Sequence, residues 1–448
     1  AAPTIETSTT KWSEYTNPIL PGWNSDPSCV FVKEFDNTLF CTTSSFLAYP
    51  GIPVYASKDF TSWKLASNAI ARPDQLPELG ESGGGPGPQS EGIWASTIRY
   101  RDGTFYLITS YINQRKWDPK LILFTTKDPF KDGWHGPIRL QNPGHDIDPD
   151  LFWDQDGTPY VSVAAGISIT PMDLTTGAPL GATFKVWNGT GDRNPEGPHL
   201  YRKDNWYYLL IGEGGTETNH SVTMARSRTL RGPYEGYDKN PVLTAKGTEN
   251  YFQTVGHADL FQDAAGNWWG VALATRSGPE WVNYPMGRET VLVPVRWEEG
   301  EFPVFETHID LSVVHRKINS GDKKLVPHLK LSVESSGKPD ESVPETSVVP
   351  IPQSWYGHPV RLLVEAIDEY KYAFSAASAA NPAHVKQLGY RNATIVSGGS
   401  GPFTGTIIGV FATKNGNEEE KAPAYVSRWR YTPVAQAVEE GKYVHVGH

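Results

Sequence analysis

The sequence predicts an all-β protein, a five-bladed β-propeller followed by a smaller β-sandwich. Helix-period patterns are scarce, whereas short runs rich in Val, Ile, Thr, Tyr, Phe and Trp recur between Gly, Asp, Asn and Pro. The chain has 448 residues, more than one hydrophobic core usually organises, which indicates at least two domains. A strand pattern also repeats along the first two thirds of the chain.

Each copy of this pattern holds a turn, an aromatic or apolar pair, a strand, and a second strand that ends in a turn. The copies begin DNTLFCTTSSF, DGTFYLITSY, DGTPYVSVAAG, DNWYYLLIGEG and AGNWWGVALAT. Five copies spaced by roughly 50 to 65 residues favour four-stranded propeller blades over the alternative, an irregular β-sandwich. The innermost strand of each blade faces the central axis, so polar residues at the starts of these strands should converge at one end of the channel.

The expected boundaries place the propeller at residues 15–312, after an N-terminal extension over 1–14. Residues 313–349 are polar and rich in Ser, Pro and Gly, which predicts a linker or an exposed segment, and 350–448 read as the β-sandwich. This second domain is expected to be incomplete, because it resembles only the latter half of the β-sandwich that follows similar propellers, and the strands that such a domain would have before VVPIP are missing after HRKI. A half-sandwich would expose sheet edges and an apolar face, which favours a segment not represented in the sequence over a reduced domain.

The two cysteines, Cys29 and Cys41, flank CVFVKEFDNTLFC, which predicts two strands around a turn near residues 34–37. Counting outward from that turn places the two cysteines opposite each other, where a cross-strand disulfide is geometrically possible. Two small buried apolar side chains are the alternative interpretation.

Charge and composition restrict the class of ligand and the compartment. The net charge of −10 argues against nucleic acid and anionic membranes, and fits an uncharged polysaccharide. No apolar run is long enough to span a bilayer, and the start AAPTIETSTT is expected to follow a removed signal peptide. Sequons at Asn188, Asn219 and Asn392 are candidate glycosylation sites. We therefore expect a secreted, extracellular glycoprotein that is monomeric.

Three carboxylates are candidates for catalysis. Asp26 and Asp148 each lie in an Asp-Pro pair ahead of a first strand, and Glu196 lies between prolines ahead of the fourth repeat. Each alone is ordinary turn chemistry. Equivalent positions in three blades indicate a shared site. Glycosidic hydrolysis needs one protonated and one ionised carboxyl group, and a third carboxylate can raise the pKa of the acid by repulsion.

These residues carry a family resemblance. The segments SDPS, GIWASTIRYRDGTFYLI, IDPDLFWDQDG, EGPHLY and VGHADL resemble, in order and spacing, the motifs of glycoside hydrolase family 43, which are five-bladed β-propeller hydrolases that invert the anomeric carbon. The resemblance implies that Asp26 is the general base, Glu196 the general acid, and Asp148 the residue that tunes and orients the acid. IDPD stands where many members have IDPS, so Asp150 is an additional acid that we interpret as structural.

The same resemblance suggests four substrate-binding residues. Trp94 matches a tryptophan that lies beside the sugar pocket, and Phe46 matches a position that forms a wall of this pocket. For both residues, packing in the core is the alternative interpretation. Arg288 matches an arginine that reaches the substrate or the carboxylates and would keep Asp26 ionised. His257 matches a central histidine that sometimes lies beside a calcium ion. No cofactor is expected to be required, no metal ligand is assigned, and a structural calcium near His257 stays open.

Four further aromatic residues are interpreted as blade core, because they occupy equivalent places in the repeats: Tyr207, Tyr208, Trp268 and Trp269. The finer resemblance, in NPILPGWNSDPSCVFV, NGTGDRNPEGPH and NYFQTVGHADLFQD, is to fungal arabinofuranosidases that act on xylan. It implies release of L-arabinofuranose from arabinoxylan, with the 1,3-linked arabinose of doubly substituted xylose as the expected target. A β-xylosidase, a bifunctional xylosidase/arabinofuranosidase and a non-catalytic carbohydrate-binding propeller are the alternatives.

Overall fold

The fold was examined in a computed structural model. The structure describes residues 15–81, 90–131, 133–142, 144–164, 166–306, 328–331, 347–355, 358–368, 370–393, 430–432, 435–439 and 442–445. Within these ranges the chain is built of β-strands and four short 3-10 helices, η1 (Lys33–Phe35), η2 (Pro73–Gln75), η3 (Pro77–Glu81) and η6 (Gln353–Trp355). No helix of this part is long and apolar enough to cross a membrane. The expected all-β class is confirmed.

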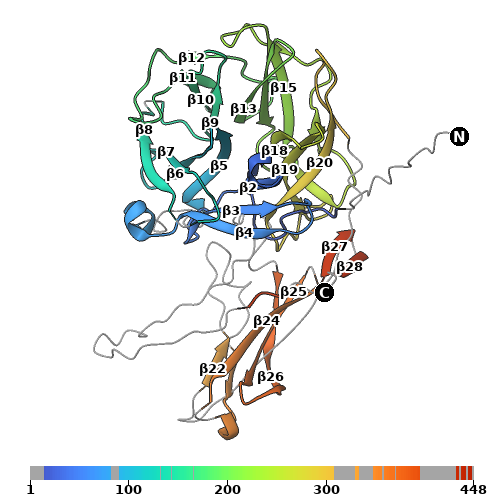
Figure 1. Ribbon diagram of the computed structural model, residues 1–448. Coiled ribbons are helices and arrows are strands. Elements are labelled where there is room, and N and C mark those ends of the chain that lie inside the picture. Colours follow the sequence, from blue (N-terminus) through green and yellow to red (C-terminus); the bar gives the residue numbers. More distant parts are fainter. Residues whose placement is uncertain are drawn as a thin grey trace, which may run out of the picture.

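Five antiparallel sheets of consecutive strands follow one another along the chain (Figure 1). The first sheet holds β1 (Ser28–Val32), β2 (Thr38–Thr42), β3 (Gly51–Ser57) and β4 (Lys64–Ile70). The second holds β5 (Gly92–Arg101), β6 (Thr104–Ile112), β7 (Lys120–Thr126) and β8 (His135–Leu140). The third holds β9 (Asp150–Trp153), β10 (Pro159–Val163), β11 (Ser168–Pro171) and β12 (Phe184–Lys185).

The remaining two sheets of this region have the same plan. The fourth holds β13 (Glu196–Lys203), β14 (Trp206–Glu213), β15 (Ser221–Ser227) and β16 (Glu235–Gly236), with β17 (Leu243–Thr244) also paired to β15. The fifth holds β18 (Phe252–Gln262), β19 (Trp268–Arg276), β20 (Arg288–Arg296) and β21 (Val304–Phe305). We refer to these sheets as blades 1 to 5 and to β1, β5, β9, β13 and β18 as the inner strands.

Turn chemistry explains why the repeated pattern forms hairpins. Between β5 and β6, Asp102 and Gly103 have φ of 48° and 72°, and Arg101 pairs with Thr104. Two central residues with positive φ make a type I′ turn, whose twist matches that of the paired strands. The dipeptide at 204–205 does the same between β13 and β14, with φ of 52° and 60°. These turns are the DG and DN pairs of the sequence repeat.

The blades form a closed ring. Each inner strand contacts the inner strands of the neighbouring blades, including β1 with β18. Five hydrophobic clusters fill the gaps between successive blades, and one of them joins blade 5 to blade 1 through Leu39, Val271 and Leu292. Tyr207, Tyr208, Trp268 and Trp269 belong to or pack against these clusters, as expected for blade core. The predicted propeller is confirmed.

The segment that precedes β1 is hydrogen-bonded to blade 5. Leu20 forms an isolated bridge with Thr290 of β20. The side chain of Asn17 donates to the Leu292 carbonyl at 2.7 Å and accepts from the Leu292 amide at 2.6 Å. The first residues of the described chain are thereby hydrogen-bonded to blade 5, so the two ends of the propeller sequence close on each other.

Cys29 of β1 lies opposite Cys41 of β2, and their sulfur atoms form a disulfide. Of the two interpretations that the sequence left open, the cross-strand disulfide is the one observed. Both residues also belong to the cluster between blades 5 and 1, so the bridge is buried.

Three smaller sheets follow the propeller. They are formed by β22 (His328–Leu331) with β23 (Ser347–Pro350), by β24 (Val360–Asp368), β25 (Lys371–Ser378) and β26 (Asn381–Asn392), and by β27 (Ala435–Glu439) with β28 (Lys442–His445). The segment expected to be a linker, 313–349, therefore contains β22 and the start of β23. The C-terminal hairpin contacts blade 5, where Arg276 Nη1 donates to the Ala437 carbonyl at 3.1 Å. The N-terminal extension lies outside the described residues.

Candidate active site

The structure gathers the three predicted carboxylates at the starts of inner strands. Asp26 precedes β1 by two residues, Asp148 precedes β9 by two residues, and Glu196 is the first residue of β13. All three interact electrostatically, because Asp26 and Glu196 both raise the pKa of Asp148, and Asp26 also raises that of Glu196. Residues remote in the sequence therefore meet at one mouth of the ring.

Asp26 is built to stay ionised. Burial favours its neutral form, but the charges of His257 and Arg288 and a hydrogen bond from Ser44 lower its pKa below the ordinary value. The distances from Asp26 Oδ1 are 3.7 Å to His257 Nδ1 and 3.8 Å to Arg288 Nη1. Ser44 Oγ donates to Asp26 Oδ2 at 2.5 Å and accepts the Ala95 amide at 2.7 Å.

Glu196 has the opposite character. Burial raises its pKa to about 7, with further upward contributions from the charges of Asp26 and Glu217. Its side chain keeps 22% of its exposed surface, so the carboxyl group is still accessible from the mouth. A carboxyl with a pKa near 7 is protonated at mildly acidic pH and can donate a proton to a leaving oxygen.

Asp148 is buried, and burial raises its pKa to about 7. Its Oδ2 accepts the amide of Gly197 at 3.1 Å, which ties it to the residue that follows Glu196. Its own amide donates to Ser110 Oγ at 3.1 Å. The carboxylate therefore contacts the backbone beside Glu196, a position from which it can orient the strand that carries that residue.

Arg288 and His257 both lie in this cluster, as the sequence predicted. Arg288 is the first residue of β20 and bonds Thr216 Oγ1 as well as facing Asp26. His257 lies in β18, and its ring occupies the space that a Cβ on Gly197 would need, 2.9 Å from Nε2. Any side chain at 197 would displace the histidine, so glycine is required there.

A row of aromatic rings runs beside the segments that carry the site. Phe46 is buried and its ring centroid lies 5.1 Å from that of Trp23 and 6.0 Å from that of Trp94. Trp94 contacts Trp117, whose indole is 52% exposed, at 6.2 Å. The aromatic row Trp23, Phe46, Trp94 and Trp117 thus ends at the surface, and its first three members lie within three residues of Asp26, Ser44 and Ala95 in the chain. Such faces suit the CH surfaces of sugars.

The backbone at the site is strained in a repeated way. Every inner strand has a residue with positive φ within it or just ahead of it: Asp26 (52°), Ala95 (37°), Asp148 (53°), Gly197 (54°) and His257 (46°). Gly92 of β5 (97°) and Thr254 of β18 (58°) are further examples. For a non-glycine residue this costs about 1 to 3 kcal/mol and persists only where the surroundings determine the conformation. Three of the five are predicted site residues, so the strain aims the functional side chains.

Sequence reasoning missed several contributors. His220 is fully buried with Nε2 3.9 Å from Glu196 Oε1, and burial lowers its pKa to about 3, so it is a neutral neighbour of that acid. Ser44 and Trp23 were also missed. His220 and Ser44 lie outside the motifs that carry the resemblance, and Trp23 lies in NPILPGWNSDPSCVFV without any local sign that its ring meets Phe46. Asp150, interpreted as structural, is indeed buried and paired with Arg99 at 2.6 Å.

The sequence also left open a calcium ion near His257 and predicted glycans at three asparagines. Among the residues that the structure describes, no group of three or more His, Cys, Asp or Glu side chains could hold a metal ion. Calcium near His257 stays a prediction.

Asn188, Asn219 and Asn392 are exposed, and their glycosylation also stays a prediction.

Comparison with known families decides the membership. Residues 15–303 match the model of glycosyl hydrolases family 43. The chain belongs to family 43. Residues 307–432 match a second model, described as the beta xylosidase C-terminal Concanavalin A-like domain, which agrees with the predicted β-sandwich.

Curated family 43 relatives include enzymes of two specificities. The chain is 37% identical over 294 residues to the non-reducing end alpha-L-arabinofuranosidase BoGH43B of Bacteroides ovatus, covering 64% of this chain and 53% of that protein. It is 38% identical over 303 residues to a xylosidase/arabinosidase of Butyrivibrio fibrisolvens, covering 63% and 55%. The chain therefore spans little more than half the length of these relatives.

Solved structures agree with the fold. A mutant of the family 43 protein BlXynB from Bacillus licheniformis superposes with a TM-score of 0.72 at 25% identity, covering 90% of this chain and 97% of that chain. The family 43 protein of a Bacteroides ovatus xyloglucan locus gives a TM-score of 0.69 at 24% identity, covering 87% and 96%.

Proposed function

We propose that this protein is an inverting glycoside hydrolase that releases L-arabinofuranose from arabinoxylan, in particular the 1,3-linked arabinose of doubly substituted xylose. The observation that carries the proposal is the opposite tuning of two neighbouring carboxyl groups. The pKa of Asp26 is lowered and that of Glu196 is raised to about 7, so one is ionised and the other protonated in the same pH range.

The proposed reaction follows from these two states. Asp26 accepts a proton from a water molecule as that water attacks the anomeric carbon, and Glu196 donates its proton to the departing glycosidic oxygen. Arg288 keeps Asp26 ionised and presents guanidinium hydrogens toward the sugar hydroxyls. Asp148 holds the backbone amide of Gly197, and through it the position of Glu196. Both protons are then accounted for, one on Asp26 and one on the leaving sugar alcohol.

The proposed substrate class is an uncharged pentose-bearing polysaccharide. The net charge of −10 and the aromatic row support a neutral sugar ligand, with Trp94 and Phe46, whose rings contact each other, as the proposed sugar-binding rings. A β-xylosidase or bifunctional activity is the second candidate, because relatives are named beta-xylosidase or xylosidase/arabinosidase and the C-terminal model carries the xylosidase name. A non-catalytic binding propeller is opposed by the presence of all three carboxylates.

The experiment is sugar release from arabinoxylan, followed by proton NMR of the product, and turnover of the nitrophenyl arabinofuranoside and xylopyranoside. We expect β-configured free arabinose as the first product and disappearance of the 1,3-linked signal, since inversion turns the α-linkage over. Glu196→Gln and Asp26→Asn should each lower kcat by at least about 1,000-fold with the fold intact. Glu299→Gln, which alters an exposed acid of blade 5, is the matched control. Preference for the xyloside would favour the second candidate, and no release of sugar would contradict both.

We also propose an extracellular location, with a monomeric enzyme acting on polymer outside the cell. The Cys29–Cys41 disulfide supports an oxidising compartment. The exposed Asn188, Asn219 and Asn392 support N-glycosylation at one or more sequons. Treatment with an endoglycosidase, followed by intact mass measurement, tests that part directly.

A further inference from the structure

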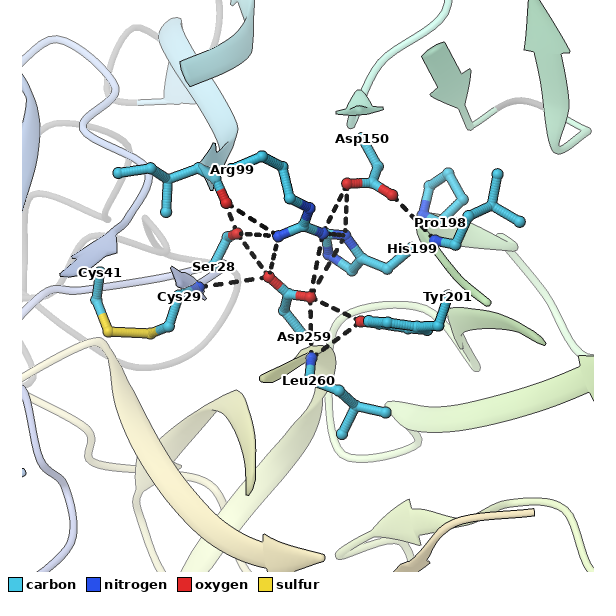
Figure 2. Close-up of polar contacts among 12 residues, drawn as sticks. Ser28, Cys29, Cys41, Arg99, Asp150, Pro198, His199, Tyr201, Asp259 and Leu260 are labelled. Atoms are coloured by element: carbon cyan, nitrogen blue, oxygen red, sulfur yellow. Dashed lines mark hydrogen bonds and ion pairs between the residues drawn. A yellow bond between two sulfur atoms is a disulfide. The ribbon is translucent and has the colours of Figure 1, made fainter. Parts of the chain in front are cut away.

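A buried polar cluster fills the axis of the ring just below the site. We call it the polar plug; its members are Ser28, Arg99, Asp150, His199, Tyr201 and Asp259 (Figure 2). Every inner strand supplies at least one member, and β13 supplies two. The family resemblance assigns none of them a role in catalysis or sugar binding, and the sequence singles out only Asp150, as a structural acid.

Arg99 is the hub of the plug. Its Nη1 donates to Asp259 Oδ2 at 2.7 Å and to Ser28 Oγ at 3.1 Å. Its Nη2 donates to Asp150 Oδ1 at 2.6 Å and lies 3.0 Å from His199 Nδ1. One planar guanidinium therefore contacts the inner strands of all four other blades, which a single-point ammonium could not do with the same geometry.

The remaining contacts complete the network around the two acids. Tyr201 Oη donates to Asp259 Oδ1 at 2.7 Å, and Ser28 Oγ donates to Asp259 Oδ2 at 2.6 Å. The side chains of Asp150 and Asp259 have no exposed surface, and that of Arg99 retains 16%. Arg99 also lines a pocket of about 610 Å³ formed by the residues that follow the plug on each inner strand. The plug therefore separates the catalytic mouth from a pocket at the other end of the axis.

The plug lies at a constant distance along the chain from the strained residues of the site. Asp26 is followed two residues later by Ser28, Asp148 by Asp150, Gly197 by His199, and His257 by Asp259. Two residues of extended chain span only about 7 Å, so fixing the plug member restricts the strained residue above it. Conformations with positive φ survive only where their surroundings determine them. In β1, β9 and β18, where the residue with positive φ is not a glycine, the plug member two residues further on is placed to restrict that conformation.

We propose that Arg99 is a positioning residue for the hydrolytic reaction, which through the plug holds Asp26, Asp148 and Glu196 in their reactive arrangement. The proposal rests on the glycosidase function proposed above. Arg99 contacts neither the carboxylates of the site nor the aromatic row, so its effect is on the alignment of reacting groups and not on the contacts that bind the sugar. Misalignment by about 1 Å can cost about 100-fold in rate.

The test compares Arg99→Lys, Arg99→Met and Tyr201→Phe with Leu209→Ala. Lysine keeps one positive charge beside Asp150 and Asp259 but loses the forked contacts, so the variant should fold and lose kcat by about 100-fold while KM changes less than about threefold. Arg99→Met also removes the positive charge, so its kcat should fall further than that of Arg99→Lys. Tyr201→Phe removes the hydroxyl that donates to Asp259 Oδ1 and accepts the Leu260 amide, but it leaves Arg99 in place, so its kcat should fall least. The graded order distinguishes positioning from a general loss of folded protein.

Leu209→Ala is the control for stability. Leu209 is a fully buried residue of β14 outside the plug, so its truncation lowers the melting temperature without touching the site. If kcat of folded Arg99→Lys stays within about threefold of the wild type, as expected for Leu209→Ala, the proposal is overturned. Wild-type turnover tests the hydrolase function separately. Should the wild type be inactive, crystal structures of Arg99→Lys decide: unchanged φ at Asp26 and Asp148 would overturn the proposal, and loss of their left-handed conformation would support it.

Discussion

At the scale of single residues, the site uses identical chemical groups in opposite states. Asp26 and Glu196 are both carboxylic acids, and burial favours the neutral form of each. The two acids differ in their neighbouring groups. Arg288, His257 and Ser44 stabilise the anion of Asp26. The negative charges of Asp26 and Glu217 instead raise the pKa of Glu196 further. Asp148 was expected to raise the acid's pKa, but burial is the largest cause, and the contact of Asp148 with the Gly197 amide gives it an orienting part.

These pKa directions predict the pH dependence of the reaction. The proposed active form needs Glu196 protonated, so kcat/KM should fall as pH rises through about 7, by about tenfold per unit well above it. It also needs Asp26 ionised, and since its pKa lies below 3.8 the rate should hold its plateau down to about pH 4. Glu196 and Asp148 both titrate near 7, so the alkaline limb belongs to the pair.

The measurement is kcat/KM on the nitrophenyl arabinofuranoside between pH 3 and 9. Glu299→Gln should reproduce the wild-type profile, because its carboxylate is exposed and far from the mouth. An alkaline limb already centred near the ordinary glutamate pKa of 4.5 would contradict the assignment of Glu196 as a buried acid.

At the scale of elements, the starts of inner strands carry the chemistry, and a loop beside them carries an exposed ring. Trp117 lies between β6 and β7, in a loop held by two hydrogen bonds: the Gln114 amide donates to Glu91 Oε1 at 3.0 Å, and Asn142 Nδ2 donates to the Pro119 carbonyl at 3.0 Å. An anchored loop presents its indole with little freedom to lose on binding. The outer end of the aromatic row is therefore suited to a sugar unit beyond the one that is cleaved.

We predict that Trp117→Ala raises KM for arabinoxylan by about 2- to 10-fold, the range expected for losing one aromatic contact. It should leave kcat/KM on the nitrophenyl arabinofuranoside unchanged, because that substrate has no polymer to occupy the outer ring. Tyr390→Ala, at an exposed tyrosine of β26, is the control. Equal losses on both substrates would mean that Trp117 supports the pocket itself and not the polymer.

At the scale of the whole molecule, stability depends on closing a ring whose ends are far apart in sequence. Asn17 is buried and makes two hydrogen bonds to the backbone of Leu292 in blade 5. Replacing it with alanine leaves both backbone groups without that partner, so Asn17→Ala should lower the free energy of unfolding by about 1 to 3 kcal/mol. The measurement is urea denaturation, with Asn250→Ala at an exposed asparagine as the control. If Asn17→Ala lowers the free energy of unfolding no more than the control does, the hydrogen bonds of Asn17 to Leu292 are not needed to close the ring.

Much of this architecture was readable before the fold was known. The DG and DN turns and the recurring apolar strands predicted the blades, because a hairpin depends on neighbouring residues only. Asp26 and Asp148 occupy equivalent repeat positions, whereas Glu196 lies one residue before the equivalent position, Gly197, so the expected equivalence of all three holds only approximately. The pairing of Cys29 with Cys41 followed from counting around one turn, although the sequence left open whether the bond forms.

Other features depended on contacts between blades. Arg99 lies in a motif, GIWASTIRYRDG, whose interpretation concerned Trp94, and nothing local shows that its guanidinium reaches four other strands. His220 likewise sits beside Glu196 only because blade 4 folds back on itself. The expected linker, 313–349, holds β22 and part of β23, since strand pairing depends on a partner that local composition does not display.

The amino-acid sequence by itself determined the strand content, the repeat, the family and the identity of three acids, because these depend on local periodicity and on motif order. Only the tertiary structure decided which acid is ionised, which ring faces outward and what holds the strained strands in place. Those properties arise from burial and from charges brought together across the ring, and such proximity has no counterpart in the linear order of residues.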